Sequence, residues 1–422
     1  MTNIIAVIGA GYGDEGKGLF TDYFANQHND SIICRSNGGA QAGHTVVTPN
    51  GIRHVFSHLG AGSFSDKPTF LSEHFICNPL LFKKEYIEFT KKHSNPSIYV
   101  HEDCLVTTPV DMIINQILEK RRAIDGNRHG SVGLGINETI ERNTVGDFKL
   151  SVGGLTSKDL QTRLFHIKTN WIDLQLPTIM DHSDDELYLL MCLENNQLWL
   201  DYIETIEYFL EHVVVVSDYN TLNTFDTVIF EGAQGLMLDQ DYGVFPHVTR
   251  SNTGVKNIID ILNHVDNIEA IEVVYVTRAY TTRHGAGPLL GEVDLPYNII
   301  DETNITHEYQ GAIRYAPLSF TVLYDAIYAD FDQIGSAEHP YRERVIANVA
   351  ITCLDQIKDT GIYYGFPGLC YNLYDDYFKP ISLLERCSGQ AYIDILLNHA
   401  NYVSYGSTRN DIVINDPLLY LD

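Results

Sequence analysis

Short apolar runs alternate along the chain with longer segments in which apolar residues recur at helical spacing. The runs predict strands, because they are rich in Val and Ile and are bounded by polar residues or glycine; they lie at residues 4–8, 31–34, 97–100, 213–216, 227–230, 271–276 and 349–354. Several are apolar throughout, which is typical of strands buried on both faces of a largely parallel sheet. Helical patterns are clearest around residues 110–122, 186–213 and 321–328.

This alternation predicts an α/β fold with a largely parallel central sheet, flanking helices and ligands at the carboxyl ends of the strands. No linker, repeat or low-complexity tract divides the chain, so we expect a single domain over residues 1–422. Residues 151–173 and 372–380 are expected to be peripheral insertions. The stretch 156–204 has only weak patterns, and its role stays open.

Composition narrows the class of protein. A net charge of −27 argues against a nucleic-acid-binding surface, although it permits a local basic pocket for a small phosphorylated ligand. No apolar run is long enough to span a membrane, and the N-terminus lacks the layout of a signal peptide. The seven cysteines include no C-x-x-C pair, which favours reduced thiols and a cytoplasmic location.

The first strand leads into GYGDEGKG at residues 11–18. The spacing G-x-x-x-x-G-K matches a phosphate-binding P-loop, in which backbone N–H groups converge on phosphate and the lysine adds a point charge. Gly18 occupies the position at which a P-loop has the Ser or Thr that holds Mg²⁺. Two acidic residues, Asp14 and Glu15, are placed near the expected phosphate. We therefore expect a P-loop-like nucleotide-binding site with altered chemistry.

Four further polar, glycine-rich stretches follow predicted strands, at residues 36–45, 230–253, 278–288 and 352–355. His44 is a candidate for stabilising a transferring phosphoryl group, although a histidine in a turn is more often structural. Arg278 and Arg283 suit a carboxylate or phosphate ligand, or are solvated surface arginines. Asp355 can accept from the N1 and N2 hydrogens of a guanine, or is an ordinary exposed strand-end residue.

Taken together and in this order, these stretches resemble the adenylosuccinate synthetase family, whose motifs read G-D-E-G-K-G, G-G-x-N-A-G-H-T, E-G-A-Q-G, V-T-S-S-N-T, A-Y-x-T-R-x-G-A-G-P and T-K-L-D. The matching segments are Gly13–Gly18, Gly38–Thr45, Glu231–Gly235, Val248–Thr253, Ala279–Pro288 and Thr352–Asp355. The resemblance implies a purine-biosynthetic ligase that joins L-aspartate to C6 of a 6-oxopurine nucleoside monophosphate. A nucleoside triphosphate first phosphorylates O6, and the amino group of aspartate then displaces phosphate.

The resemblance also implies roles for individual residues. Asp14 would remove the N1 proton, His44 would assist as acid, Lys17 would neutralise phosphate, and Gln234 would contact the purine. Mg²⁺ would be held by Asp14 and the Gly43 carbonyl. Contacts to the triphosphate are expected from Gly13, Glu15, Gly16, Gly18, Gly43, Thr45, Asp355, Ser404 and Gly406. Contacts to the purine monophosphate are expected from Gln41, Ser131, Val132, Arg142 and Thr249, and contacts to aspartate from Gly311 and Arg314. Family members are usually homodimers, and Arg142 matches an arginine that reaches the neighbouring subunit's nucleotide.

Departures from the family pattern leave the substrates open. Val132 replaces a hydroxyl expected to contact phosphate, a single Arg314 remains of an arginine-rich loop, and Cys353 replaces a lysine expected over the donor base. The leading hypothesis is IMP as acceptor and GTP as donor. The alternative is a dGMP-using 2-amino-deoxyadenylosuccinate synthetase, with ATP as a second candidate donor. From another class, the chain would be a non-catalytic nucleotide-binding homologue, and a generic P-loop NTPase is a weaker hypothesis still.

Overall fold

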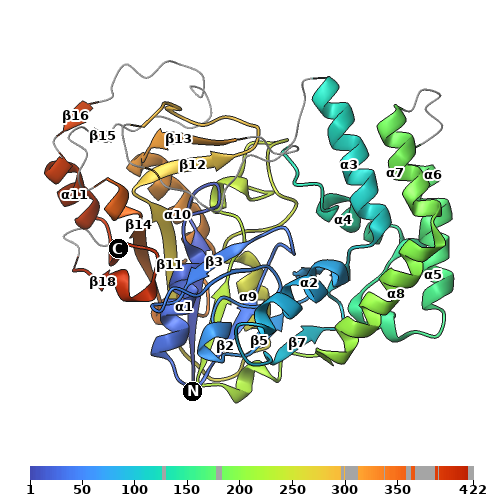
Figure 1. Cartoon of the computed structure of the whole chain (residues 1–422). Coiled ribbons are helices and arrows are strands. Elements are labelled where there is room, and N and C mark those ends of the chain that lie inside the picture. The colour runs from blue at the N-terminus through green and yellow to red at the C-terminus, as the bar shows by residue number, and fades with distance from the viewer. Residues whose placement is uncertain are drawn as a thin grey trace.

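A computed structural model describes residues 1–125, 130–176, 183–295, 299, 312–336, 338–357, 363–365, 385–387 and 389–416. Its centre is a ten-stranded sheet (Figure 1). In order across the sheet the strands are β18 (Ile412–Ile414), β17 (Tyr402–Ser404), β14 (Val345–Thr352), β11 (Ile268–Arg278), β1 (Thr2–Gly9), β10 (Thr227–Glu231), β2 (Ser31–Arg35), β5 (Thr69–Leu71), β7 (Ile98–His101) and β9 (Val214–Val216). Every neighbouring pair is parallel except β17 and the edge strand β18. The largely parallel sheet predicted from the apolar runs is therefore confirmed.

Helices cover both faces of the sheet, which explains the apolar runs. On β1, Ile5 and Val7 pack with Phe20 and Phe24 of α1 on one face. The alternate residues of β1 pack on the opposite face with residues of α9 and α10. The helices are α1 (Lys17–Gln27), α2 (Pro79–Thr90), α3 (Pro109–Ile124), α4 (Ile136–Thr144), α5 (Leu160–His166), α6 (Ile172–Gln175), α7 (Asp184–Glu194), α8 (Asn196–Glu211), α9 (Lys256–Leu262), α10 (Phe320–Gly335) and α11 (Gly389–Leu397).

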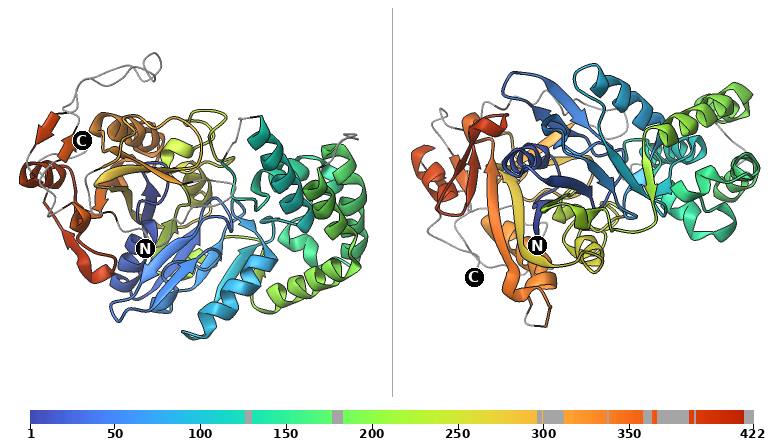
Figure 2. Two further views of the ribbon diagram at one scale, coloured as in Figure 1. Left: turned by 45° about the horizontal axis from the view of Figure 1, so that its top comes forward. Right: turned by 90° about the horizontal axis from the view of Figure 1, so that it is seen from below.

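Small two-stranded units stand beside the main sheet. They are β3 (His44–Val47) with β4 (Arg53–Phe56), β12 (Tyr280–His284) with β13 (Ile313–Pro317), β6 (Ile76–Cys77) with β8 (Leu105–Val106), and β15 (Tyr363–Gly365) with β16 (Glu385–Cys387). In Figures 1 and 2, α3 to α8 gather at the end of the sheet where β9 lies, and the C-terminal elements lie at the opposite end. Residues 151–173 belong to the helical end, as expected, whereas residues 372–380 lie outside the described residues.

Two predicted elements need correction. Residues 186–213 do not form one helix: α7 ends at Glu194, and Asn195 adopts an extended backbone and caps α8 by accepting from the Gln197 N–H. The last predicted strand ends earlier than expected, because β14 stops at Thr352 and Cys353 turns the chain with a left-handed φ of 64°. Among the described residues, no helix is long and apolar enough to cross a membrane.

Candidate functional site

The GYGDEGKG loop joins β1 to α1 at the carboxyl edge of the sheet, and the Glu15 side chain points back into the loop. The Glu15 carboxylate accepts from the N–H groups of Gly11 (3.1 Å) and Gly13 (2.7 Å). Lys17 Nζ donates to the same carboxylate at 2.6 Å, and the side chains of both charged residues are 4% exposed. Two loop amides and the lysine, all expected to face phosphate, are therefore paired with Glu15 in this structure.

Packing at the start of α1 explains why Gly18 carries no hydroxyl. A Cβ added at Gly18 would lie 3.0 Å from the His44 Cβ and 3.1 Å from the Thr45 carbonyl oxygen. Gly16, which has a left-handed φ of 102°, is likewise packed against Thr352: a Cβ added there would lie 2.9 Å from the Thr352 Cγ2. The start of α1 thus lies against β3 on one side and against the end of β14 on another, and a serine at position 18 would require β3 to shift by a few tenths of an ångström.

Asp14 directly follows Gly13 in the loop and has a left-handed conformation, with φ of 63°. Arg278 Nε donates to its carbonyl oxygen at 2.5 Å, and the Thr352 hydroxyl donates to the following carbonyl, that of Glu15, at 2.8 Å. Burial raises the pKa of the Asp14 carboxyl above its ordinary value, and the Arg278 charge opposes this shift. A carboxyl with a raised pKa is suited to act as a general base near neutral pH.

His44, the first residue of β3, is held by a buried carboxylate. Its Nδ1 lies 2.5 Å from Glu231 Oε1, and Glu231 Oε2 accepts from the Ala61 N–H at 3.0 Å. Arg35 Nε lies 3.9 Å from Glu231 Oε2. Burial alone would raise the pKa of Glu231, but His44 and Arg35 together hold it below its ordinary value. A carboxylate on Nδ1 orients the imidazole and leaves Nε2 as its second polar atom.

Gln234 is positioned by the segment that precedes it. Asn37 donates to the Ala233 carbonyl (3.0 Å) and accepts from the Ala233 N–H (2.7 Å), and Gln234 itself has a left-handed φ of 56°. Gln234 Oε1 and Gln41 Oε1 are buried, and neither has a hydrogen-bond partner among the described residues. Unpaired buried acceptors are costly, so these two oxygens suit a ligand that brings N–H or O–H donors.

The donor-side candidates meet at neighbouring strand ends. Asp355 lies on the turn Leu354–Gln356 that follows β14, and Ser404 ends β17, the next strand in the sheet. The Ser404 hydroxyl donates to the Gly406 carbonyl at 2.7 Å. Burial raises the pKa of Asp355 above its ordinary value. These residues share the sheet edge with the GYGDEGKG loop.

Two arginines are engaged within the protein. The fully buried Arg142 pairs with both oxygens of Asp111 at 2.9 Å and donates to the carbonyls of Val106 and Phe148. These bonds give it an internal role, and they do not support the expectation that it contacts a purine monophosphate. Arg314 donates to Glu292 Oε2 at 2.7 Å and to two carbonyls, those of Gly285 and Gly287. Gly311 lies outside the described residues.

The remaining acceptor-side candidates, Ser131, Val132 and Thr249, lie in two loops. The Ser131 hydroxyl donates to Asn115 Oδ1 at 2.6 Å and accepts from the Gly133 N–H at 3.2 Å, and Val132 lies within this turn. The Thr249 N–H donates to the Leu238 carbonyl at 2.7 Å. These bonds shape the two loops, and the hydrocarbon side chain of Val132 has no polar atom with which to contact phosphate.

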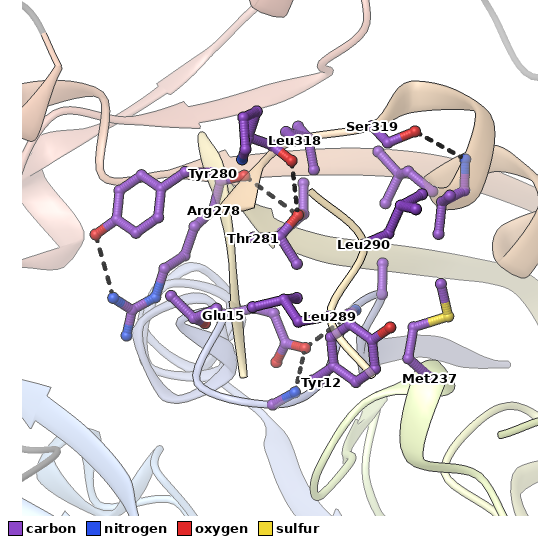
Figure 3. Close-up of a pocket in the computed structure, with 18 residues that line it drawn as sticks. Tyr12, Glu15, Met237, Arg278, Tyr280, Thr281, Leu289, Leu290, Leu318 and Ser319 are labelled. Carbon is purple, nitrogen blue, oxygen red and sulfur yellow. Dashed lines mark hydrogen bonds between the residues drawn. The ribbon is translucent and has the colours of Figure 1, made fainter. Parts of the chain in front are cut away.

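A pocket opens beside the GYGDEGKG loop, on the side that faces β12 and the start of α10 (Figure 3). Its walls are mostly apolar and include Tyr12, Met237, Leu289 and Leu318, with Arg278 at one end. Tyr12 also carries the Arg283 guanidinium over its ring at 4.4 Å from the centroid. The pocket therefore borders the loop that holds Asp14.

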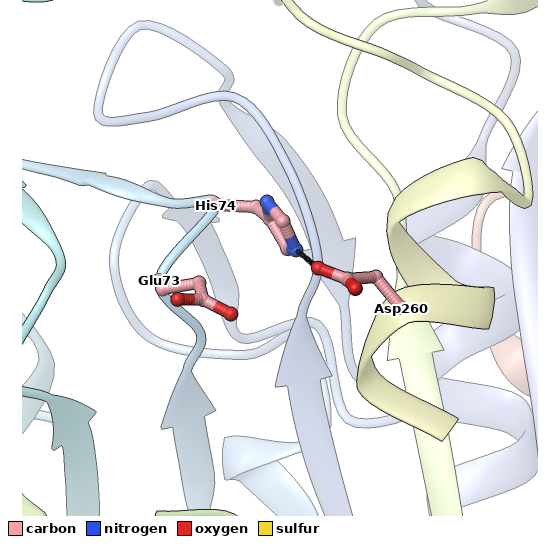
Figure 4. Close-up of side chains that lie close together, drawn as sticks. All are labelled: Glu73, His74 and Asp260. Carbon is pink, nitrogen blue, oxygen red and sulfur yellow. Dashed lines mark hydrogen bonds and ion pairs between the residues drawn. The ribbon is translucent and has the colours of Figure 1, made fainter. Parts of the chain in front are cut away.

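Oxygen ligands for Mg²⁺ are available at this edge. Asp14 supplies a carboxylate, and the contact of Gly18 with β3 brings the segment that contains Gly43 to the start of α1. Carboxylate and carbonyl oxygens are the ligands that Mg²⁺ prefers, so this donor set fits the ion. A second group, Glu73, His74 and Asp260, lies elsewhere (Figure 4), but His74 Nε2 and Asp260 Oδ2 are 3.0 Å apart and form an ion pair with each other.

Sequence reasoning overlooked the residues that orient the candidate catalytic groups, chiefly Glu231, Arg35 and Asn37. A signal for two of them exists in the sequence. Arg35 and Glu231 each end an apolar strand, and β2 and β10 are neighbours in which these two residues are register partners. Opposite charges at the ends of two buried strands indicate a buried ion pair, provided that the strands are known to be adjacent.

Comparison with known proteins gives the family. The sequence profile described as Adenylosuccinate synthetase matches residues 6–312. The Adenylosuccinate synthetase of Microcystis aeruginosa is 29% identical over 297 residues, which are 70% of this chain and 63% of that protein. The Adenylosuccinate synthetase of Lactiplantibacillus plantarum is 30% identical over 395 residues, 91% of this chain and 85% of that protein. The match thus spans less than two thirds of the first relative and most of the second.

Two solved structures share the fold. The fully ligated Adenylosuccinate synthetase from Plasmodium falciparum has a TM-score of 0.72 and 19% identity, with 98% of this chain and 100% of that chain covered. The cyanophage S-2L Succinoaminodeoxyadenylate synthetase (PurZ), bound to dGMP and dATP as an energy donor, has a TM-score of 0.59 and 17% identity, with 98% and 96% covered. Since the profile match covers well over half of the sequence and the Lactiplantibacillus relative is matched along most of both chains, this protein belongs to the adenylosuccinate synthetase family.

Proposed function

We propose that the protein is a ligase that forms a C–N bond between L-aspartate and C6 of a 6-oxopurine nucleoside monophosphate. IMP is the proposed acceptor and GTP the proposed donor, with adenylosuccinate as the product. The observation that carries this proposal is the arrangement around the start of α1, where Asp14, the His44–Glu231 pair and Gln234 come from three separate segments. Here a base (Asp14), an acid (His44) and an unpaired amide oxygen (that of Gln234) lie beside a phosphate-type loop. This set suits the activation of an amide-like oxygen by phosphoryl transfer.

Each side chain has a chemical task in this reaction. Asp14 accepts the N1 proton of the purine, so that O6 can attack the terminal phosphoryl group of the donor. His44, oriented by Glu231, donates a hydrogen bond to the transferring phosphoryl group, and Lys17 neutralises charge there. Gln234 Oε1 accepts from a purine N–H. Mg²⁺, held by Asp14 and the Gly43 carbonyl, would supply charge neutralisation between the phosphates when bound.

The remaining contacts follow the strand ends. Asp355, Ser404 and Gly406 are proposed for the donor nucleotide, together with the phosphate loop and Thr45. Gln41, Ser131, Val132 and Thr249 are proposed for the acceptor nucleotide, without Arg142. Gly311 and Arg314 are proposed for aspartate. For Arg314 to contact a substrate carboxylate, it has to exchange its bond to the partly exposed Glu292. We also propose a cytoplasmic homodimer, without Arg142 as the residue that crosses between subunits.

A second acceptor, dGMP, is favoured by one feature of the site. Val132 cannot donate to phosphate, and the guanidinium of Arg142 is engaged inside the protein, so two expected polar contacts to the nucleotide are missing. The family's arginine-rich loop is also reduced to a single arginine, Arg314, so an arginine expected near the ribose hydroxyls is missing from the sequence. Loss of that contact weakens selection for ribose over deoxyribose. The PurZ relative in the structural comparison is bound to dGMP and dATP. By resemblance, members of the 2-amino-specific branch tend to carry a smaller residue at the position of Asp14. The aspartate is retained here, and we therefore keep IMP as the first candidate.

The test is phosphate release in the presence of Mg²⁺, an acceptor, a donor and L-aspartate. IMP, GMP, dGMP and dIMP are each combined with GTP, ATP and dATP, and products are identified by mass. We expect release only when L-aspartate is present, with IMP and GTP the fastest pair. Release of phosphate without aspartate would indicate an NTPase, and a faster reaction with dGMP would select the alternative.

Replacing the base gives the mutational test. Asp14→Asn removes the proton acceptor and should abolish the coupled reaction with little change in stability. Asp66→Asn is the matched control, because Asp66 is also an aspartate with a left-handed φ, of 56°, and its carboxylate contacts only surface groups. A fully active Asp14→Asn variant would exclude Asp14 as the base.

A further inference from the structure

Arg278, the last residue of β11, contacts the phosphate loop directly. Its Nε donates to the Asp14 carbonyl oxygen at 2.5 Å, and its Nη1 donates to the Tyr280 hydroxyl at 3.3 Å. The second bond is drawn in Figure 3, where the Tyr280 ring lies beside the extended arginine side chain. The guanidinium is thus held between the loop and Tyr280.

The bond to the loop matters because Asp14 has a backbone conformation that residues other than glycine rarely adopt. Such a conformation persists only where surrounding groups enforce it. Here two successive loop carbonyls are held, that of Asp14 by Arg278 and that of Glu15 by the Thr352 hydroxyl. Arg278 and Thr352 are register partners at the ends of β11 and β14, so adjacent strand ends hold the loop together.

Arg278 is supported in turn from the donor side of the site. Tyr280 is 1% exposed, and its hydroxyl also hydrogen-bonds the side chain of Gln356. Gln356 ends the same turn that carries Asp355. A continuous set of contacts therefore runs from the turn proposed to bind the donor base, through Tyr280 and Arg278, to the backbone of Asp14.

We propose that Arg278 is a positioning residue for Asp14, and that Tyr280 and Gln356 hold Arg278 in the geometry this requires. The proposal rests on the proposed function for the role of the Asp14 carboxylate. It assigns to Arg278 no contact with substrate: the side chain acts by fixing the peptide on which the base is carried. Preorganisation of this kind affects the rate of the chemical step more than the binding of substrates.

Arg278→Met in the full-length protein tests this, because methionine keeps an aliphatic side chain and removes every donor. We expect kcat to fall about 100-fold, as for a displacement of a catalytic group by about 1 Å, with the donor Kd and acceptor KM changed less than about threefold. Arg278→Lys retains a single donor nitrogen and should restore kcat to within about tenfold of the wild type. Tyr280→Phe should lower kcat about three- to tenfold.

Hydrogen exchange of residues 9–18 without nucleotide gives a readout that does not need turnover. We expect faster exchange in Arg278→Met. Arg344→Met is the matched control, since Arg344 Nη1 donates to the Ile268 carbonyl at 2.7 Å, at the other end of the same strand. It should change neither the loop exchange nor kcat.

The outcomes separate this inference from the proposed function. If kcat and loop exchange of Arg278→Met both equal those of the wild type, the positioning role is wrong. It is also wrong if the donor affinity falls as much as kcat, because the loop would then serve binding alone. If the wild type lacks aspartate-dependent turnover, the proposed function fails. Faster loop exchange in Arg278→Met would still support the positioning of Asp14 by Arg278.

Discussion

Replacing Glu231 by glutamine tests whether a buried carboxylate sets the protonation of His44. In the wild type one oxygen faces His44 Nδ1 at 2.5 Å, and the other accepts from the Ala61 N–H at 3.0 Å. A glutamine has one acceptor and one donor group. If its oxygen keeps the bond to Ala61, its NH₂ group faces Nδ1, which must then be unprotonated. The proton of the neutral imidazole moves to Nε2, and the charge that stabilises the imidazolium is lost.

The burial of Glu231 sets the size of two expected changes, one in the free energy of unfolding and one in kcat. Glu231 and Arg35 are each 0% exposed, and Arg35 Nε and Nη2 have no hydrogen-bond partner among the described residues. Removing the negative charge leaves the guanidinium without a counter-charge, which costs about 3 kcal/mol of unfolding free energy. Loss of a preorganised acid beside the phosphoryl group should lower kcat about 100-fold.

The pH dependence of kcat distinguishes an electrostatic effect on His44 from a loss of activity caused by general destabilisation. Burial lowers the pKa of His44, and the Glu231 charge raises it, so Glu231→Gln must lower it further. If protonated His44 is the active form, activity is lost as the pH rises through its pKa. The alkaline limb of the kcat profile should therefore move to lower pH in Glu231→Gln.

Glu85→Gln is the matched control, because Glu85 is 6% exposed, accepts from the backbone N–H groups of residues 57–59, and lies 3.4 Å from His58 Nδ1. It should lose comparable stability in urea unfolding without moving the pH profile. A Glu231→Gln variant whose alkaline limb coincides with that of the wild type would refute the reasoning, whatever its stability.

Two further changes have expected outcomes. Burial raises the pKa of Asp330 to about 7, so its folded form favours the proton; stability should fall as the pH rises from about 4 through about 7, by a few kcal/mol at most. Asp330→Asn should flatten this slope in urea unfolding measured across the same range, and an unchanged slope would contradict the assignment. Gly18→Ser restores the hydroxyl of an ordinary P-loop, but its Cβ would lie 3.0 Å from the His44 Cβ, so we expect a loss of about 1–3 kcal/mol and a lower kcat. A gain in Mg²⁺ affinity of Gly18→Ser, measured by titration of activity, would show instead that β3 moves aside.

Much of the fold was predictable because the information is local. Strands that are buried on both faces need continuous apolar runs, and the central parts of β1 (residues 4–8), β10 (residues 228–230) and β11 (residues 273–276) have them. The break between α7 and α8 was missed because apolar residues at helical spacing lie on both sides of the polar run 194–197, in which Asn195 caps the second helix. The end of β14 was missed for a similar reason, since Cys353 is apolar yet has a left-handed backbone.

The site was predictable as a set of segments and less so as a set of contacts. Asp14, His44 and Gln234 stand out by their place after predicted strands. Nothing near Arg142 in the sequence indicates that its guanidinium pairs with Asp111, and nothing near Gly18 indicates its contact with His44. Such contacts depend on which elements are neighbours in space.

Residues close in the chain fix which segments can form strands and which loops can carry polar chemistry, because backbone conformation and burial pattern are largely local. Which charge each polar group meets depends instead on how distant segments pack. By placing β1 between β10 and β11, the fold brings Glu231 to His44 and Arg278 to Asp14, pairs that are 187 and 264 residues apart. Electrostatic and hydrogen-bond energies fall steeply with distance, so they act only once the order of the strands is set.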